Sequence, residues 1–195
     1  MGGEEDSGVK YLIGSSAGKS AVISAFIATH VATMAGLWFG GARLPKFDFN
    51  QLNGWLVLGF GADPVQTWVV GGILHYTSGI IWGVVFALIM HPALGRFKPL
   101  AALTPVNNYI KGLIWGVVLW IVSSALWMPL LIGPLFGGGA VGPFLTKFFD
   151  NGVQALITNL LWHSIYGVNL GLLFSPTPAS SSRSAWRAGS GVGVR

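Results

Sequence analysis

Four long apolar segments, separated by shorter polar stretches, dominate the pattern of hydrophobic and polar positions along this chain. They cover about residues 20–41, 67–90, 112–133 and 153–174, and none of them contains Lys, Arg, Asp or Glu. An α-helix rises about 1.5 Å per residue, so about twenty apolar residues cross a hydrocarbon core of about 30 Å. The pattern therefore predicts an all-α integral membrane protein, with a four-helix transmembrane bundle over residues 19–175.

The segments around this predicted domain differ from it in composition. Residues 1–18 form a polar N-terminal leader, and residues 176–195 form a low-complexity C-terminal tail rich in Ser and Gly. Between the first two spans lies a shorter apolar run, NGWLVLGFGA, at residues 53–62. It is too short to cross a bilayer, so we expect an interfacial or re-entrant segment there.

A histidine followed by two glycines at four-residue intervals occurs twice. The copies are His75-Gly79-Gly83 in the second span and His163-Gly167-Gly171 in the fourth. Positions i, i+4 and i+8 lie along one stripe of a helix. Because the second and fourth spans run in the same direction, we interpret the chain as two repeated helical hairpins.

Small residues recur at four-residue spacing in every predicted span. Helices in lipid gain little from hydrophobicity when they associate, so close backbone approach becomes the main attraction between them. We therefore expect a set of glycines to lie at helix–helix contacts: Gly36, Gly40, Gly79, Gly83, Gly112, Gly116, Gly167 and Gly171.

The composition agrees with a membrane protein and narrows its chemistry. The chain has 195 residues, of which 52% are hydrophobic and 9% charged, against about 25% charged in average soluble domains. Its mean hydropathy is +0.64. It has no cysteine, which excludes disulfides, thiolate catalysis and iron–sulfur ligation.

The basic residues predict the orientation. Eight lie on the side of the N-terminus and three on the other side: Lys10, Lys19, Arg96, Lys98, Lys111, Arg183, Arg187 and Arg195 against Arg43, Lys46 and Lys147. Cytoplasmic loops carry the excess of Lys and Arg, so both termini are expected in the cytoplasm of a bacterium, with the spans in its inner membrane. The net charge of +5 then reflects topology, and we expect neither a nucleic acid nor a nucleotide as partner.

Three histidines, His30, His75 and His163, fall inside the predicted spans. Ionisable groups are costly in hydrocarbon, so each is a candidate functional residue. One interpretation is that they are polar clamps that hydrogen-bond neighbouring Ser, Thr or Asn residues. A second is that they are axial ligands of haem b or a chlorophyll-type tetrapyrrole, with the glycines one and two turns away letting the macrocycle lie against the helix. A third is proton transfer.

The position of His30 differs from that of the other two. It lies about 160° around its helix from the stripe of small residues, so it is expected to point away from the bundle, toward another subunit. The spans contain no Asp or Glu, which disfavours ion-coupled transport. No catalytic residues and no metal site are predicted, and we do not expect an enzyme.

Three stretches resemble an uncharacterised bacterial family of four-helix integral membrane proteins: GILHYTSGIIWGVVFAL (72–88), KGLIWGVVLWIVSSALWMPLL (111–131) and HSIYGVNLGLLF (163–174). The shared motifs are GxxH, matched by Gly72 and His75, a Met-Pro at Met128 and Pro129, and HxxYGxxxG, matched by His163, Tyr166, Gly167 and Gly171. The resemblance implies the four-span topology and carries no activity.

Three functions follow as hypotheses. The first is a non-catalytic subunit that stabilises or assembles a larger energy-transducing complex, respiratory or photosynthetic. Its partners would be the lipid bilayer and other integral membrane subunits. The second is a small b-type cytochrome or pigment-binding protein that uses the intramembrane histidines. The third is a small-solute permease built from the repeat.

Overall fold

Helices make up nearly all of the residues that the computed structural model describes, namely 16–46, 48–132 and 152–176. Four of them are long: α2 (Ser16–Trp38), α4 (Pro64–Val85), α6 (Pro105–Val122) and α8 (Gly152–Leu173). A shorter helix, α3 (Phe49–Leu58), precedes α4. The described residues contain no β-strand, so the predicted all-α class is confirmed for them. The N-terminal leader and most of the tail lie outside the described residues.

Three of the long helices continue into irregular turns. The 3₁₀ turn η1 (Phe39–Ala42) follows α2, and the π-helical turn η2 (Phe86–Met90) joins α4 to α5 (His91–Gly95). The π-helical segment η4 (Ser123–Ile132) extends α6. Pro92 follows η2. A proline lacks an N–H and its ring crowds the preceding turn, so a locally widened turn accommodates it without ending the helix.

Three stretches are long and apolar enough to cross a membrane, namely Ala17–Ala42, Pro64–Gly95 and Pro105–Trp127. The second and third begin earlier than predicted, at Pro64 and Pro105. The fourth predicted span coincides with α8, which has 22 residues and no charged side chain. It is not among the three, because its helix carries several amide, hydroxyl and imidazole groups.

Capping residues determine where these helices begin. Asp63 accepts hydrogen bonds from the backbone N–H groups of Val65 and Gln66 at 3.0 and 2.9 Å, and Thr104 accepts one from Asn107 at 3.2 Å. A proline follows each of these capping residues, at the position where its missing N–H costs nothing. Asp48 caps α3 in the same way through the N–H of Gln51.

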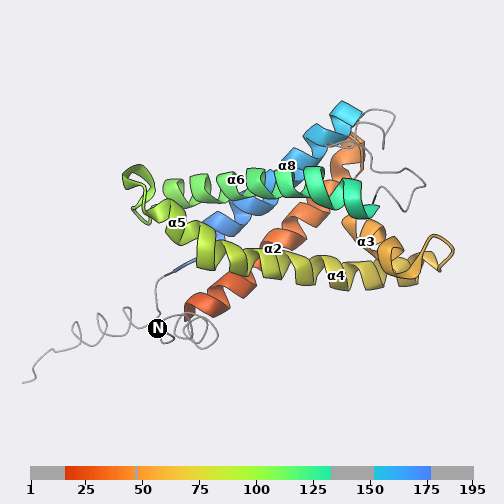
Figure 1. The fold of residues 1–195 in the computed structure, drawn as a ribbon, viewed down its shortest axis with the longest axis horizontal. Coiled ribbons are helices and arrows are strands. Elements are labelled where there is room, and N and C mark those ends of the chain that lie inside the picture. The colour runs from red at the N-terminus through yellow and green to blue at the C-terminus, as the bar shows by residue number, and fades with distance from the viewer. Residues whose placement is uncertain (1–15, 47, 133–151, 177–195) are drawn as a thin grey trace, which may run out of the picture.

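The four long helices form an open ring. Helix α4 packs on α2, α2 on α8, and α8 on α6, whereas α4 and α6 make no comparably broad contact. In Figure 1, α2 and α8 run diagonally, and α4 and α6 cross them. We call this loosely packed boundary between α4 and α6 the α4–α6 seam. One end of it is closed by Trp115, whose ring centroid lies 6.0 Å from that of Trp82 and 6.2 Å from that of Phe86.

The glycines of the repeated motif face the helix that precedes them in the chain. A Cβ at Gly79 would overlap Thr29 of α2, and one at Gly83 would overlap Ala25. In the second hairpin, a Cβ at Gly167 would overlap the carbonyl oxygen of Gly112. Gly116 and Gly171 are equally close to backbone atoms of the facing helix, and Gly36 is buried in α2.

One predicted position needs correction. Gly40 does not pack against a helix, because it lies in η1 beyond the end of α2 and a Cβ there would meet nothing within 4 Å. Lys111 lies in α6 with its side chain buried, and its Nζ has no hydrogen-bond partner among the described residues. The start of α2 and the end of α8 lie together, since the N–H of Ser175 donates to Ser20 Oγ at 2.9 Å.

Candidate ligand-binding site

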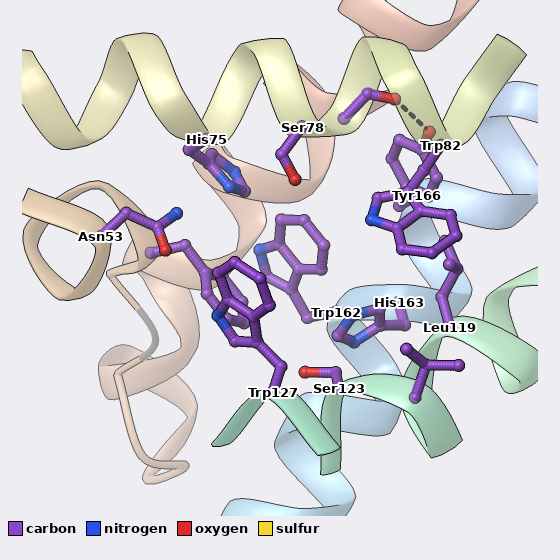
Figure 2. Close-up of a pocket in the computed structure, with 13 residues that line it drawn as sticks. Asn53, His75, Ser78, Trp82, Leu119, Ser123, Trp127, Trp162, His163 and Tyr166 are labelled. Atoms are coloured by element: carbon purple, nitrogen blue, oxygen red, sulfur yellow. Dashed lines mark hydrogen bonds between the residues drawn. The ribbon is translucent and has the colours of Figure 1, made fainter. Parts of the chain in front are cut away.

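A cavity of about 100 Å³ lies beside the α4–α6 seam, against α8 and the start of α3. Its polar lining comes from Asn53, His75, Ser78, Ser123 and His163. Its aromatic lining comes from Phe49, Trp82, Trp127, Trp162 and Tyr166. Figure 2 shows the three tryptophans and Tyr166 converging from the surrounding helices. Of the described residues that line the cavity, none is Asp, Glu, Lys or Arg.

His75 is held by Thr33 of α2. Its Nε2 lies 3.0 Å from Thr33 Oγ1, and the Thr33 hydroxyl donates to the carbonyl of Thr29 at 2.7 Å. Since the threonine proton is used in that bond, Nε2–H of His75 is the donor to Thr33. The neutral imidazole then keeps an acceptor lone pair on Nδ1.

His163 is held by its own helix. Its Nδ1 donates to the carbonyl of Asn159 at 2.9 Å, which leaves the acceptor lone pair on Nε2. The Asn159 side chain in turn donates to Ser124 Oγ at 3.0 Å, tying α8 to η4. Each buried histidine therefore presents one remaining acceptor nitrogen, with its tautomer set by a neighbouring oxygen.

Two aromatic rings lie between the histidines. The indole of Trp162 has its centroid 5.3 Å from that of His75 and 5.0 Å from that of His163. Phe49, at the start of α3, stacks on His75 at 5.5 Å and meets His163 edge-on at 6.1 Å. Figure 2 shows Trp162 between the two labelled imidazoles. The fold thus brings His75 and His163 to one site, but not into direct contact.

Two polar atoms of the cavity wall lack partners among the described residues. They are Asn53 Oδ1 and Trp162 Nε1, and their side chains are only 7% and 5% exposed. An unpaired buried polar atom costs about 1–3 kcal/mol, so native structures usually pair it with protein, water or a ligand. Both atoms are themselves closed off, so an occupant of the cavity reaches them only when the surrounding side chains shift. The acceptor nitrogens of His75 and His163 belong to residues that line the cavity as well.

Tyr166 joins α8 to α4 beside the cavity. Its hydroxyl donates to the carbonyl of Gly79 at 2.7 Å, and its side chain is almost fully buried. The ring also lies parallel to Trp162, with centroids 6.2 Å apart. From the sequence, Tyr166 was identified only as part of the HxxYGxxxG motif. The other three site residues were not predicted at all: Phe49, Asn53 and Trp162.

His30 lies elsewhere. It is exposed on the flank of α2, where its Nδ1 shares a hydrogen bond of 2.8 Å with the hydroxyl of Tyr76 on α4. The rings of Phe26 and Tyr76 pack beside it, with centroids 5.3 Å apart. The structure therefore does not place His30 with the other two histidines, and it agrees with the expectation that this side chain points away from the bundle.

A tetrapyrrole does not fit between His75 and His163 in this arrangement. Phe49 and Trp162 occupy the space between the imidazoles, and a cavity of about 100 Å³ lies well below the roughly 300–1,000 Å³ of ordinary ligand pockets. The glycines that were expected to accommodate the macrocycle are instead covered by neighbouring helices. Holding a macrocycle here would require both aromatic side chains to leave.

Comparison with known proteins adds no further constraint on the site. The chain matches no protein-family model, no curated protein and no solved structure. The resemblance to a four-helix membrane family stays a prediction, and the function has to be argued from the geometry.

Proposed function

We propose that this chain is a four-span integral membrane protein that binds a small, uncharged molecule in the cavity beside the α4–α6 seam. Helix α8 is the fourth span: its polar groups face its neighbours, where Asn159 and His163 are buried, and its length matches that of α4. The role is non-catalytic, with both termini in the cytoplasm. The observation that carries the proposal is the cavity itself, which is lined by aromatic rings and by five polar side chains without a fixed charge.

Uncharged ligands suit this lining because the cavity contains hydrogen-bonding groups without a fixed charge. Small-molecule sites are typically apolar concavities with a few convergent polar groups, which is the composition found here. A charged ligand would have to give up its hydration with no counter-ion to replace it.

Native mass spectrometry of the protein released from its own membranes tests the proposal. We expect a bound small molecule that is lost in the double variant Asn53→Leu with Trp162→Phe and kept in Trp68→Phe, a control on the exposed side of α4. A folded wild-type protein that never carries such a molecule, from native membranes or after exposure to added candidates, contradicts it.

A second function is favoured by the exposed pair of His30 and Tyr76. A histidine facing lipid at the level of a span is costly, whereas a partner helix would cover it. On this ground the chain would be a subunit that stabilises or assembles a larger energy-transducing complex, respiratory or photosynthetic. The cavity and this flank lie apart, so the two functions are compatible.

Co-purification from native membranes tests the second function. We expect components of a respiratory or photosynthetic complex to accompany the wild-type chain and to be lost from His30→Leu, while Ile23→Leu, another exposed position of α2, retains them. An unchanged association of His30→Leu contradicts the role of this flank. A Soret band abolished by His75→Ala and His163→Ala would instead support the tetrapyrrole hypothesis.

A further inference from the structure

We infer that the ligand of this cavity is a single flat ring bearing hydroxyl groups, of the phenol or hydroquinone class, and that it enters sideways from the lipid through the α4–α6 seam. The inference rests on the proposed function and names its ligand class and route.

The size of the cavity limits the ligand to about one ring. A cavity of about 150 Å³ in another protein holds one benzene molecule, and the present cavity measures about 100 Å³. A hydroxylated six-membered ring is slightly larger than benzene, so it fits only when the side chains at the mouth move outward. These are Trp82 and Trp127, which are 36% and 41% exposed. Larger ring systems do not fit.

The walls favour a flat ring. Phe49 and Trp162 are buried, and with the two tryptophans at the mouth they place aromatic faces or edges on several sides of the cavity. Aromatic side chains bind flat rings in stacked or edge-to-face arrangements, worth about 0.5–1.5 kcal/mol each beyond the area buried.

The hydrogen-bonding groups favour hydroxyl substituents. Trp162 Nε1 lacks an acceptor and Asn53 Oδ1 lacks a donor, and a ligand reaches these closed-off atoms when the side chains around them shift. The remaining nitrogens of His75 and His163 are acceptors as well, since their N–H groups are used by Thr33 and Asn159. A hydroxyl both donates and accepts, so a ring that carries one or two of them can satisfy both kinds of group. A plain hydrocarbon ring can satisfy neither.

The route follows from the open ring of helices. Three of the four boundaries between neighbouring long helices are packed, and the cavity lies at the fourth, the α4–α6 seam. Both helices carry exposed apolar side chains, among them Ile81 of α4 and Ile121 of α6. In a bilayer such surfaces face acyl chains, so a lipid-dissolved molecule reaches the cavity without crossing an aqueous phase.

Binding to the full-length protein in lipid nanodiscs tests this inference, with quenching of tryptophan fluorescence and the melting temperature as two readouts. The probes are decylhydroquinone, decylbenzene with the same tail but no hydroxyl, and the tail-less hydroquinone. We expect saturable binding of decylhydroquinone, at least tenfold weaker binding of each other probe, and at least a tenfold loss in Asn53→Leu and in Trp162→Phe. Trp68→Phe is the matched control and should bind as the wild type does.

The outcomes separate the inference from the function on which it rests. Equal binding of decylbenzene overturns the ligand class. An association rate of decylhydroquinone that follows its concentration in water instead of its concentration in the membrane overturns the lateral route. A different uncharged solute that binds and depends on Asn53 overturns the ligand class while the proposed function stands. If no probe binds and native mass spectrometry finds no molecule, the cavity holds water only. That result contradicts both the ligand class and the proposed function. If Asn53→Leu or Trp162→Phe fails to fold, Ser78→Ala takes its place, because it removes a hydroxyl from the cavity lining and keeps the aromatic walls.

Discussion

Individual side chains in this protein illustrate how a polar group is kept inside an apolar helix bundle. His75 and His163 each give their N–H to an oxygen of the protein, Thr33 Oγ1 in one case and the Asn159 carbonyl in the other. These bonds satisfy the donors of both rings and fix their tautomers, so the histidines act as clamps whatever the cavity holds. The groups left unsatisfied, on Asn53 and Trp162, belong to residues beside them.

The hydroxyl of Tyr166 supplies the first prediction. Tyr166→Phe removes the hydrogen bond to the Gly79 carbonyl and should lower the free energy of unfolding by about 0.6–1.5 kcal/mol, the range of single hydrogen bonds in membrane and soluble proteins. Denaturation in mixed micelles measures this, with Tyr109→Phe on the exposed side of α6 as control. Equal stability of both variants would show that the bond between α8 and α4 contributes nothing.

At this scale the sequence predicted part of the site. His75 and His163 stood out because of their repeated spacing, and their mutual proximity follows from the parallel direction of two helices. Trp162 and Phe49 could not be singled out, because aromatic residues are frequent in every span. Asn53 lies in a short apolar run whose place against α4 depends on tertiary contacts of Gly54 with Thr67 and of Gly71 with Asn50.

Among the helices, the glycine contacts determine how closely neighbours approach. Gly167 lies against the backbone of Gly112, which cannot turn aside as a side chain would. Gly167→Ala gains up to about 1 kcal/mol of helix propensity but suffers an overlap that typically costs about 1–3 kcal/mol. We therefore expect a net loss of about 1–2 kcal/mol in the free energy of unfolding.

The control for this prediction is Gly61→Ala, where a new Cβ would meet nothing within 4 Å. Thermal unfolding in detergent compares the two variants. A Gly167→Ala protein as stable as Gly61→Ala would show that α6 and α8 do not pack through this glycine.

Helix α8 supplies the prediction on topology. As the fourth span it should place Val153 near the external surface and Leu173 near the cytoplasmic one, and both side chains are exposed. Because the chain has no native cysteine, Val153→Cys and Leu173→Cys can each be labelled alone in intact cells. A membrane-impermeant maleimide should modify Val153→Cys only. Modification of both from outside, or of neither before or after lysis, contradicts the assignment.

The whole molecule departs from its internal repeat at one place. Both hairpins pack their second helix on the first through glycines, as the repeated motif predicted. An exact repeat would close the α4–α6 seam as tightly as the boundary between α2 and α8, yet the cavity lies there. This difference follows from the side chains: α2 offers a stripe of buried alanines at its boundary, whereas the seam carries Trp82, Leu119 and Trp127. Periodicity alone predicts four packed boundaries and cannot predict one that stays open.

The most direct measurement uses two adjacent serines of η4. Ser123 lines the cavity and Ser124 does not, although both are buried. A thiol reacts as the thiolate, which forms in a hydrated cavity and not in a dry helix contact. With small, uncharged N-ethylmaleimide we expect Ser123→Cys to be modified and Ser124→Cys to stay unmodified. Ala102→Cys, in the exposed turn before α6, is the positive control and should react fully under the same conditions. If Ser123→Cys is as unreactive as Ser124→Cys where Ala102→Cys reacts, no accessible cavity exists at the α4–α6 seam.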